Sequence, residues 1–99
     1  MNNYDYDVEA IFIFIGRKRN KIVNSGYRPA HLINGYLTSG IQMYKKEGCK
    51  NINIRTITFL SPQYYPRTLY KGKIIKFYEG SIQTGYAIII KVNNELLQR

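Results

Sequence analysis

The clearest β-strand signal in this chain is the run GYAIIIKV, residues Gly85–Val92. Successive side chains of a strand point to opposite faces, so apolar residues that alternate with a period of two indicate a strand. Here the alternation divides six apolar side chains between two faces: Tyr86, Ile88, Ile90 and Val92 on one, Ala87 and Ile89 on the other. The run therefore predicts a strand that is apolar on both faces.

The same period appears near the N-terminus, from about Tyr6 to Ile15. One face of this segment carries Val8, Ala10, Phe12 and Phe14, and the other carries Ile11, Ile13 and Ile15. Two apolar faces indicate a strand that is buried on both sides or that lies in a closed barrel. A further strand is predicted over Lys73–Glu79, with Ile75 and Phe77 on one face.

A change of phase in the middle of the chain predicts a β-bulge. Ile52 and Ile54 follow one alternation, whereas Ile57 and Phe59 follow the opposite one. A slip of one residue moves the side chains of a strand to its other face, and an inserted bulge residue produces such a slip. We therefore expect a bulge near Arg55-Thr56.

Turn residues separate these runs. Turns that contain glycine are expected at Gly26–Pro29, Lys46–Gly48, Tyr70–Gly72 and Glu79–Ser81, the last as a hairpin loop. Gly40–Lys46 alone has the length of a short helix, and its apolar spacing is weak. Roughly five to seven short strands without a convincing helix predict one all-β domain over residues 1–99, built as a small barrel or sandwich.

The charge of the chain points to a negatively charged partner. Its 99 residues include 15 Lys+Arg and 6 Asp+Glu, which give a formal net charge of +9. Nucleic acid, an acidic protein face or an anionic membrane surface would each fit such a charge. Asp5, Asp7 and Glu9 make the extreme N-terminus acidic, and we expect this acidic head to lie on the surface, against a basic patch of the same chain.

No arrangement of residues predicts catalysis. The single histidine, His31, and the single cysteine, Cys49, are separated in sequence, and we expect a loop-edge imidazole and a surface or half-buried thiol rather than a catalytic pair. Metal-ligand spacings are absent, and Ile74 stands where a phosphate-binding loop at Gly72-Lys73 would need Ser or Thr. We predict a protein that is not an enzyme and that uses no cofactor and no metal.

The sequence also lacks the features that direct a chain to a membrane. Its longest apolar run, Ile11–Ile15, is far shorter than the ~20 residues of a membrane span. The acidic N-terminus is unlike a secretory signal, and a lone cysteine permits no internal disulfide. These features predict a cytoplasmic protein that does not bind membranes.

Basic and aromatic residues are the remaining candidates for function. Arg17, Lys18, Arg19 and Lys21 place four cations in five residues directly after the first predicted strand, where a loop on a rigid barrel can present them to phosphates. Tyr64–Arg67 and Tyr27-Arg28 combine rings that can stack on bases with arginines that can pair with phosphates. The structural alternative is a solvated basic loop and tyrosines that fill the wall of the barrel.

Four segments resemble one known domain. Gly16–Lys21 followed by Ser25–Pro29 is similar to GGR-x-T-P…GYRP, and Thr38–Gly40 falls where that domain has V-T-G. Thr58–Pro62 is similar to T-L-I-H-P, and Glu79–Val92 aligns without a gap with E-G-G-R-T-V-G-A-G-V-V-A-K-V. The domain is the C-terminal barrel of elongation factor Tu, and the resemblance covers roughly residues 7–93.

The resemblance implies a six-stranded antiparallel Greek-key barrel with a core over about residues 6–93. In that family the barrel touches the T-stem backbone of aminoacyl-tRNA and contacts the GTPase domain. The matching positions here are Glu79 and Gly80 in the last hairpin, Ser39, and Arg17 and Lys18 in the basic loop. Three family contact residues are replaced, by Ala30, Ser61 and Ile82. The chain resembles a stand-alone relative of this barrel.

Two functions are therefore expected. The first is a module that binds structured RNA, such as a tRNA stem, through its backbone, using Arg17, Lys18, Arg19, Lys21, Arg28, Ser39, Arg67, Glu79 and Gly80. The second is a protein-interaction module, of a regulatory or immunity type, that docks on translation machinery or on an acidic protein. The lost contacts at Ala30, Ser61 and Ile82 favour the second, and the basic loop favours the first.

Overall fold

The computed structural model describes residues 5–19, 21, 23–44 and 54–99. Six strands make up this part of the chain: β1 (Val8–Phe14), β2 (Ala30–Ile33), β3 (Tyr36–Tyr44), β4 (Ile54–Phe59), β5 (Ile74–Glu79) and β6 (Ile82–Val92). Three single 3-10 turns connect or follow them: η1 (Gly16–Lys18), η2 (Pro62–Tyr64) and η3 (Glu95–Leu97). The predicted turn at Lys46–Gly48 and the predicted environment of Cys49 lie outside the described residues.

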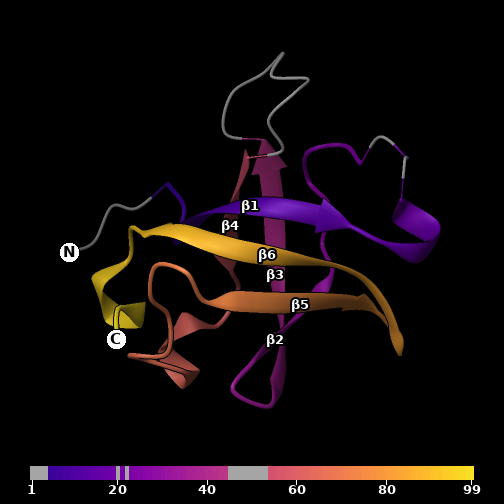
Figure 1. The fold of residues 1–99 in the computed structure, drawn as a ribbon. Coiled ribbons are helices and arrows are strands. Elements are labelled where there is room, and N and C mark those ends of the chain that lie inside the picture. The colour runs from indigo at the N-terminus through magenta and orange to yellow at the C-terminus, as the bar shows by residue number, and fades with distance from the viewer. Residues whose placement is uncertain (1–4, 20, 22, 45–53) are drawn as a thin grey trace.

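The strands close into one antiparallel barrel in the order β1-β4-β3-β2-β5-β6. Figure 1 shows β1, β6 and β5 side by side across the front, with β2, β3 and β4 crossing behind them. The N-terminal strand β1 closes the barrel, because it pairs with β4 on one side and with β6 on the other. The prediction of an all-β barrel is confirmed, and Gly40–Lys46, the segment with the length of a helix, begins as part of β3.

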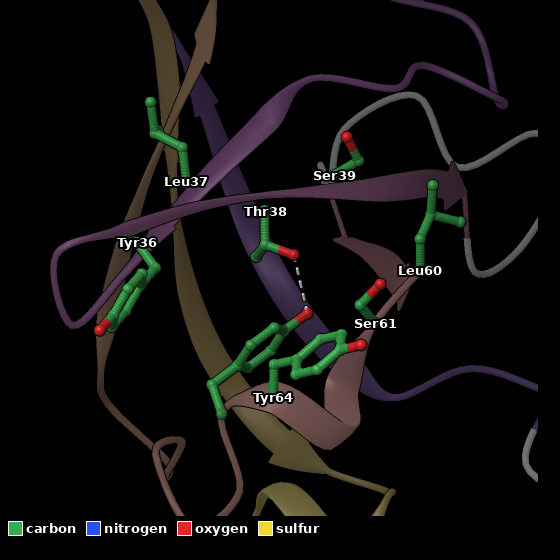
Figure 2. A pocket seen from close by; sticks show the side chains of 8 residues that line it. Tyr36, Leu37, Thr38, Ser39, Leu60, Ser61 and Tyr64 are labelled. Carbon is green, nitrogen blue, oxygen red and sulfur yellow. Dashed lines mark hydrogen bonds between the residues drawn. The ribbon is translucent and has the colours of Figure 1, made fainter.

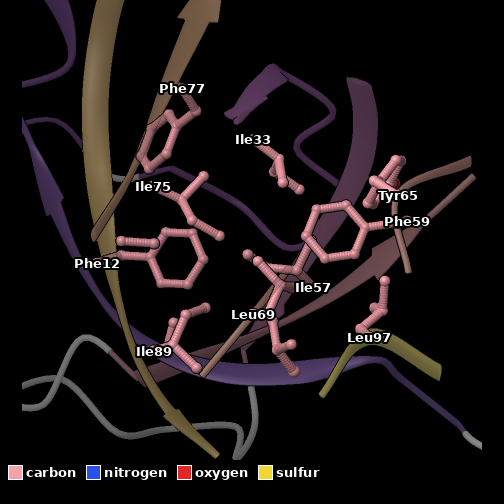
Figure 3. Close-up of a cluster of buried hydrophobic side chains, with 13 residues drawn as sticks. Phe12, Ile33, Ile57, Phe59, Tyr65, Leu69, Ile75, Phe77, Ile89 and Leu97 are labelled. Carbon is pink, nitrogen blue, oxygen red and sulfur yellow. The ribbon is translucent and has the colours of Figure 1, made fainter. Parts of the chain in front are cut away.

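The interior of the barrel is filled by one of the two faces of each strand. In β1 the inward residues are Val8, Ala10 and Phe12, whereas Ile11 and Ile13 point outward and are exposed. Figure 3 shows the resulting core, in which Phe12, Phe77 and Phe59 lie among aliphatic side chains from the other strands. Each large apolar side chain buried in this way contributes about 1.5–3 kcal/mol, so the core supplies most of the drive to fold.

Gly85 is required by this packing. A Cβ placed on it would lie 2.4 Å from Phe77 Cζ and 2.5 Å from the Ile13 carbonyl oxygen. β5 and β6 can approach each other at the pair Phe77–Gly85 only because Gly85 carries no side chain.

The predicted bulge at Arg55-Thr56 is wrong. β4 pairs with β1 and β3 in an unbroken register through these residues. The apolar alternation changes phase because Ile54 points outward, whereas Ile57 and Phe59 point into the core. The inward position next to Ile54 is occupied by a charged residue, Arg55. The irregularities lie in β6 instead, one opposite Glu9 and Ala10 and one opposite Phe77 and Tyr78. The first turns Val92 inward against the core, away from the face of Tyr86.

The acidic head is not a surface feature throughout. Asp5 is exposed, but Asp7 and Glu9 are buried. The Asp7 carboxylate accepts hydrogen bonds from the Phe59 backbone N–H (2.7 Å) and from Asn94 Nδ2 (2.9 Å). These partners lie 52 and 87 positions away, so no local pattern in the sequence indicates that Asp7 is buried.

Polar side chains also enter the barrel. His31, Gln42 and Arg55 are fully buried. The His31 ring, predicted at a loop edge, instead lies inside β2, with its Nε2 atom 3.0 Å from Gln42 Nε2 and with Phe59 and Phe77 beside it. Burial lowers the pKa of His31 to about 4, so the ring is neutral and its Nε2 atom can accept the amide N–H.

Candidate nucleic-acid interface

The basic loop is anchored on the last hairpin of the barrel. After β1, Ile15 N–H donates to the Thr84 carbonyl (2.9 Å), and the chain turns through η1, where Gly16 has a positive φ of 56°. Lys18 N–H then donates back to the Ile15 carbonyl (3.1 Å). The start of the loop is thus fixed to β6 by backbone hydrogen bonds, which leaves its side chains to define the surface.

A network around Glu79 joins the loop to the hairpin between β5 and β6. Lys18 Nζ lies 3.3 Å from Glu79 Oε2, and the Tyr27 hydroxyl donates to the same oxygen (2.5 Å). Because the single Tyr27 proton goes to Glu79, the Thr84 hydroxyl, 2.8 Å away, donates to Tyr27. Lys18 Nζ also lies 5.3 Å from the centre of the Tyr27 ring. We call these four residues the Glu79 network.

The electrostatics of the Glu79 network favour an ionised carboxylate. The Tyr27 hydroxyl, followed by Lys18 and Arg17, lowers the pKa of Glu79. Burial and the hydrogen bond to Glu79 raise the pKa of Tyr27, so its hydroxyl keeps its proton. Glu79 is therefore an acceptor that holds Lys18 in place, and it neutralises one cation of the basic loop.

The remaining cations of the loop are exposed. Arg17, Arg19 and Lys21 are open to solvent, as is Arg28, which follows Tyr27 on the segment that pairs with β3 at Gln42. Exposed arginines and lysines on an anchored loop can contact phosphate oxygens without first losing a partner. The structure thus brings Arg17 and Lys18 from the loop together with Glu79 and Gly80 from the hairpin.

Ser39 and Arg67 lie elsewhere. Ser39 is exposed on β3, and Ala30 on β2 pairs with both Ser39 and Tyr78, so Ser39 lies two strands away from the residue before Glu79. Arg67 N–H donates to the Leu96 carbonyl beyond the C-terminal end of β6 (2.9 Å). Gly80 precedes the other end of β6, so Arg67 is separated from the basic loop by the length of that strand.

The tyrosines divide between the two predicted roles. Tyr27 packs against Phe14 and Phe77, and Tyr65 is buried against Phe59 with its hydroxyl 3.1 Å from that of Thr38. These two rings complete the core, as the structural alternative predicted. Tyr64 is 79% exposed and has the freedom to contact a ligand.

The structure contains a cleft beside Tyr64 that was not predicted from the sequence. It encloses about 620 Å³ between the start of β3 and the segment around η2. Figure 2 shows Tyr36 and Leu37 on one side of it and Ser61 and Tyr64 on another, with the Thr38–Tyr65 hydrogen bond between them. The signal that could have located one wall is Asn34-Gly35, a two-residue hairpin turn in which both residues have positive φ.

Other kinds of site find no support in the described residues. Within residues 5–19, 21, 23–44 and 54–99, no three His, Cys, Asp or Glu side chains are grouped so that they could hold a metal ion. The helical segments in this part are single turns, and none is long and apolar enough to cross a membrane. In comparisons with known proteins, no family model matches the sequence, and no curated protein matches it.

Proposed function

We propose that this protein is a non-enzymatic module that binds structured RNA, such as a tRNA stem, through the sugar-phosphate backbone. The observation that carries the proposal is the contact between the basic loop and the last hairpin, where Lys18 Nζ lies 3.3 Å from Glu79 Oε2. Arg19, Lys21 and Arg28 extend this surface with exposed positive charge. Phosphate contacts of this kind bind a helix with little regard to its base sequence.

The resemblance of the sequence to the C-terminal barrel of elongation factor Tu favours the same proposal. The closed order β1-β4-β3-β2-β5-β6 is compatible with the Greek-key barrel that the resemblance implies. The matching residues Arg17, Lys18, Glu79 and Gly80 belong to two segments that are distant in sequence yet joined in the fold by the contact between Lys18 and Glu79. Ile82, at the position of a family arginine, pairs with Glu79 and adds no charge, so contact with RNA would depend on the loop.

The experiment is a filter-binding titration with unmodified tRNA at two salt concentrations. If four cations contact the phosphates of a double-stranded stem, the slope of log affinity against log salt is about −3.6, which is a roughly 150-fold loss of affinity between about 50 and 200 mM salt. Replacement of Arg17, Arg19 and Lys21 by alanine should reduce the magnitude of this slope and weaken binding.

A charge-matched control separates this surface from the general basicity of the chain. Lys71, Lys76 and Lys91 are exposed, and their replacement by alanine removes the same charge from other places. Binding should survive in this control. Equal losses in the two triple variants, or no binding at low salt, would overturn the proposal.

A protein partner, the second function expected from the sequence, draws support from a different surface. That surface is the outer face of β1, β5 and β6. It carries exposed isoleucines, whereas the basic loop carries exposed cations.

A further inference from the structure

A row of four isoleucines crosses the outside of the barrel. Ile11 on β1 pairs with Ile54 on β4 and with Ile88 on β6, and Ile88 pairs in turn with Ile74 on β5. Residues that are directly opposite each other in antiparallel strands project from the same face of a sheet. Since Phe12 and Ile75, their neighbours in sequence, are buried in the core, the four isoleucines project outward. We call this surface the isoleucine face.

The isoleucine face is open to solvent. Ile74 is 58% exposed and Ile11 is 39% exposed, and Ile54 and Ile88 are half-buried between their neighbours. A second row beside it pairs Ile13 with Tyr86 and Tyr86 with Lys76, so the apolar surface continues along β1 and β6. Figure 1 shows these three strands, β1, β6 and β5, as one continuous layer across the front of the molecule.

Strand propensity alone does not account for these isoleucines. The outward positions of β4 that follow Ile54 are Thr56, which is buried, and Thr58, which is half-buried; both are also β-branched and equally suited to a strand. The chain thus uses threonine on one part of its outer wall and isoleucine in a row on another. A contiguous apolar patch on the outside of a small domain marks a surface that another molecule covers.

The charges around the isoleucine face indicate which kind of molecule would cover it. Lys76 lies in the second row and Lys91 lies further along β6, and both are exposed. Glu9, which lies opposite Lys91, is buried and accepts a hydrogen bond from the Tyr6 hydroxyl (2.6 Å), so the exposed charges of these rows are those of the two lysines. The rim of the isoleucine face is therefore cationic, and its complement has an apolar centre with carboxylates around it.

We propose that the isoleucine face is the docking surface for an acidic protein. A second copy of this chain fits less well, because two such faces in contact would oppose Lys76 and Lys91 with their own counterparts, in two molecules of charge +9 each. A flat wall of short, branched side chains matches another protein surface at the packing density of an interface core. This proposal is distinct from RNA binding, since the four isoleucines are not among the residues proposed to contact RNA.

The test begins with capture on the immobilised protein from a nuclease-treated lysate of its native host cells. Three forms are compared: the unchanged chain, the double variant Ile11→Thr/Ile74→Thr, and the control Leu37→Thr/Leu60→Thr. Threonine keeps the β-branching of isoleucine, and the two leucines are exposed in the cleft beside Tyr64, away from the isoleucine face. An acidic protein captured by the first and third forms but not by the second is then purified and titrated.

We expect the purified partner to bind at least tenfold more weakly to Ile11→Thr/Ile74→Thr and within twofold of unchanged affinity to the control. Higher salt should weaken binding, and Lys76→Ala should reduce that dependence. Circular dichroism shows whether the double variant folds; if it does not, the single variant Ile74→Thr, at the most exposed position of the row, gives the same comparison without a change of charge.

Several outcomes would overturn the proposal. The proposal is wrong if all three forms capture the same proteins. It is also wrong if the double variant retains every protein that the unchanged chain captures. A dimer in sedimentation velocity that Ile11→Thr/Ile74→Thr dissociates would assign the face to a second copy. Co-sedimentation with phosphatidylserine vesicles that the same variant abolishes would assign it to a membrane surface.

Discussion

The His31 side chain is fully buried inside the barrel. Its ring lies between Phe59 and Phe77 with Gln42 as its polar neighbour. Burial disfavours the charged imidazolium, so the ring is neutral at pH 7. Gly40 makes room for it, because a Cβ at that position would lie 2.9 Å from His31 Cε1. Histidine and glycine are therefore matched across β2 and β3.

This environment predicts acid sensitivity. Burial lowers the pKa of His31 from 6.5, the ordinary value of an exposed histidine, to about 4 in the folded protein, so the unfolded chain binds an extra proton between these values. Stability is then complete above pH 6.5 and falls as the pH drops from 6.5 to 4, by roughly 3 kcal/mol. Urea unfolding of the unchanged chain and of His31→Met across this range measures the difference. Parallel pH profiles for the two would contradict the prediction.

Gly85 provides a second test at the level of one residue. Gly85→Ala introduces a methyl group that collides with Phe77 and with the Ile13 carbonyl, and moving backbone is more costly than turning a side chain. We expect a loss of about 2–3 kcal/mol in the free energy of unfolding. Ser81→Ala, in the neighbouring hairpin loop, is the control and should change stability by less than about 0.5 kcal/mol. A stable Gly85→Ala variant would show that β5 and β6 can separate without cost.

At the scale of elements, the Glu79 network ties η1 to the hairpin of β5 and β6. Tyr27→Phe removes the hydroxyl that donates to Glu79 and accepts from Thr84 while the ring stays in the core. The pKa of Glu79 should then rise, because its largest stabilising contact is lost. Titration followed by NMR of the Glu79 carboxyl carbon measures the shift. Thr68→Ser, which keeps its bond to Tyr65 far from this site, should leave it unchanged.

The elements differ in how far the sequence predicts them. Alternation located β1, β5 and β6, because each has one face of apolar residues that meets the core. It failed in β4, because Arg55 faces inward and its contacts, including the bond to the Val23 carbonyl, come from a distant segment. The short β2 gives too few residues for a period, and only the Asn34-Gly35 turn indicates its hairpin with β3.

The candidate site shows the same division. Arg17–Lys21 is visible as a basic run, but its contact with Glu79 depends on the pairing of β1 with β6, which no local pattern contains. The isoleucine row is likewise a product of register, since its four members come from four strands. Spacing within a strand gives the face of each side chain, and only the closed barrel decides which of them are neighbours.

Across the whole molecule, the two ends of the described chain stabilise one another. Asn93 and Asn94 donate their backbone N–H groups to the Asp7 carbonyl (2.8 and 3.0 Å), and Asn94 also bonds the Asp7 carboxylate. Beyond them, Leu97 enters the core, and its N-terminal neighbour Leu96 remains exposed. The segment after β6 is therefore part of the fold and covers one end of the barrel, near Leu69.

This arrangement predicts opposite results for two adjacent leucines. Leu97→Ala removes a fully buried side chain from the cluster with Leu69 and should cost about 2–5 kcal/mol. Leu96→Ala changes an exposed side chain and should stay within about 0.5 kcal/mol. Chemical denaturation of both variants measures the contrast, with circular dichroism as the signal. Equal losses of stability in the two variants would show that the last residues do not contribute to the core, and that the barrel depends on the pairing of β1 with β4 and β6 alone. If the losses differ as expected, the core of the barrel is complete only when Leu97 is in place.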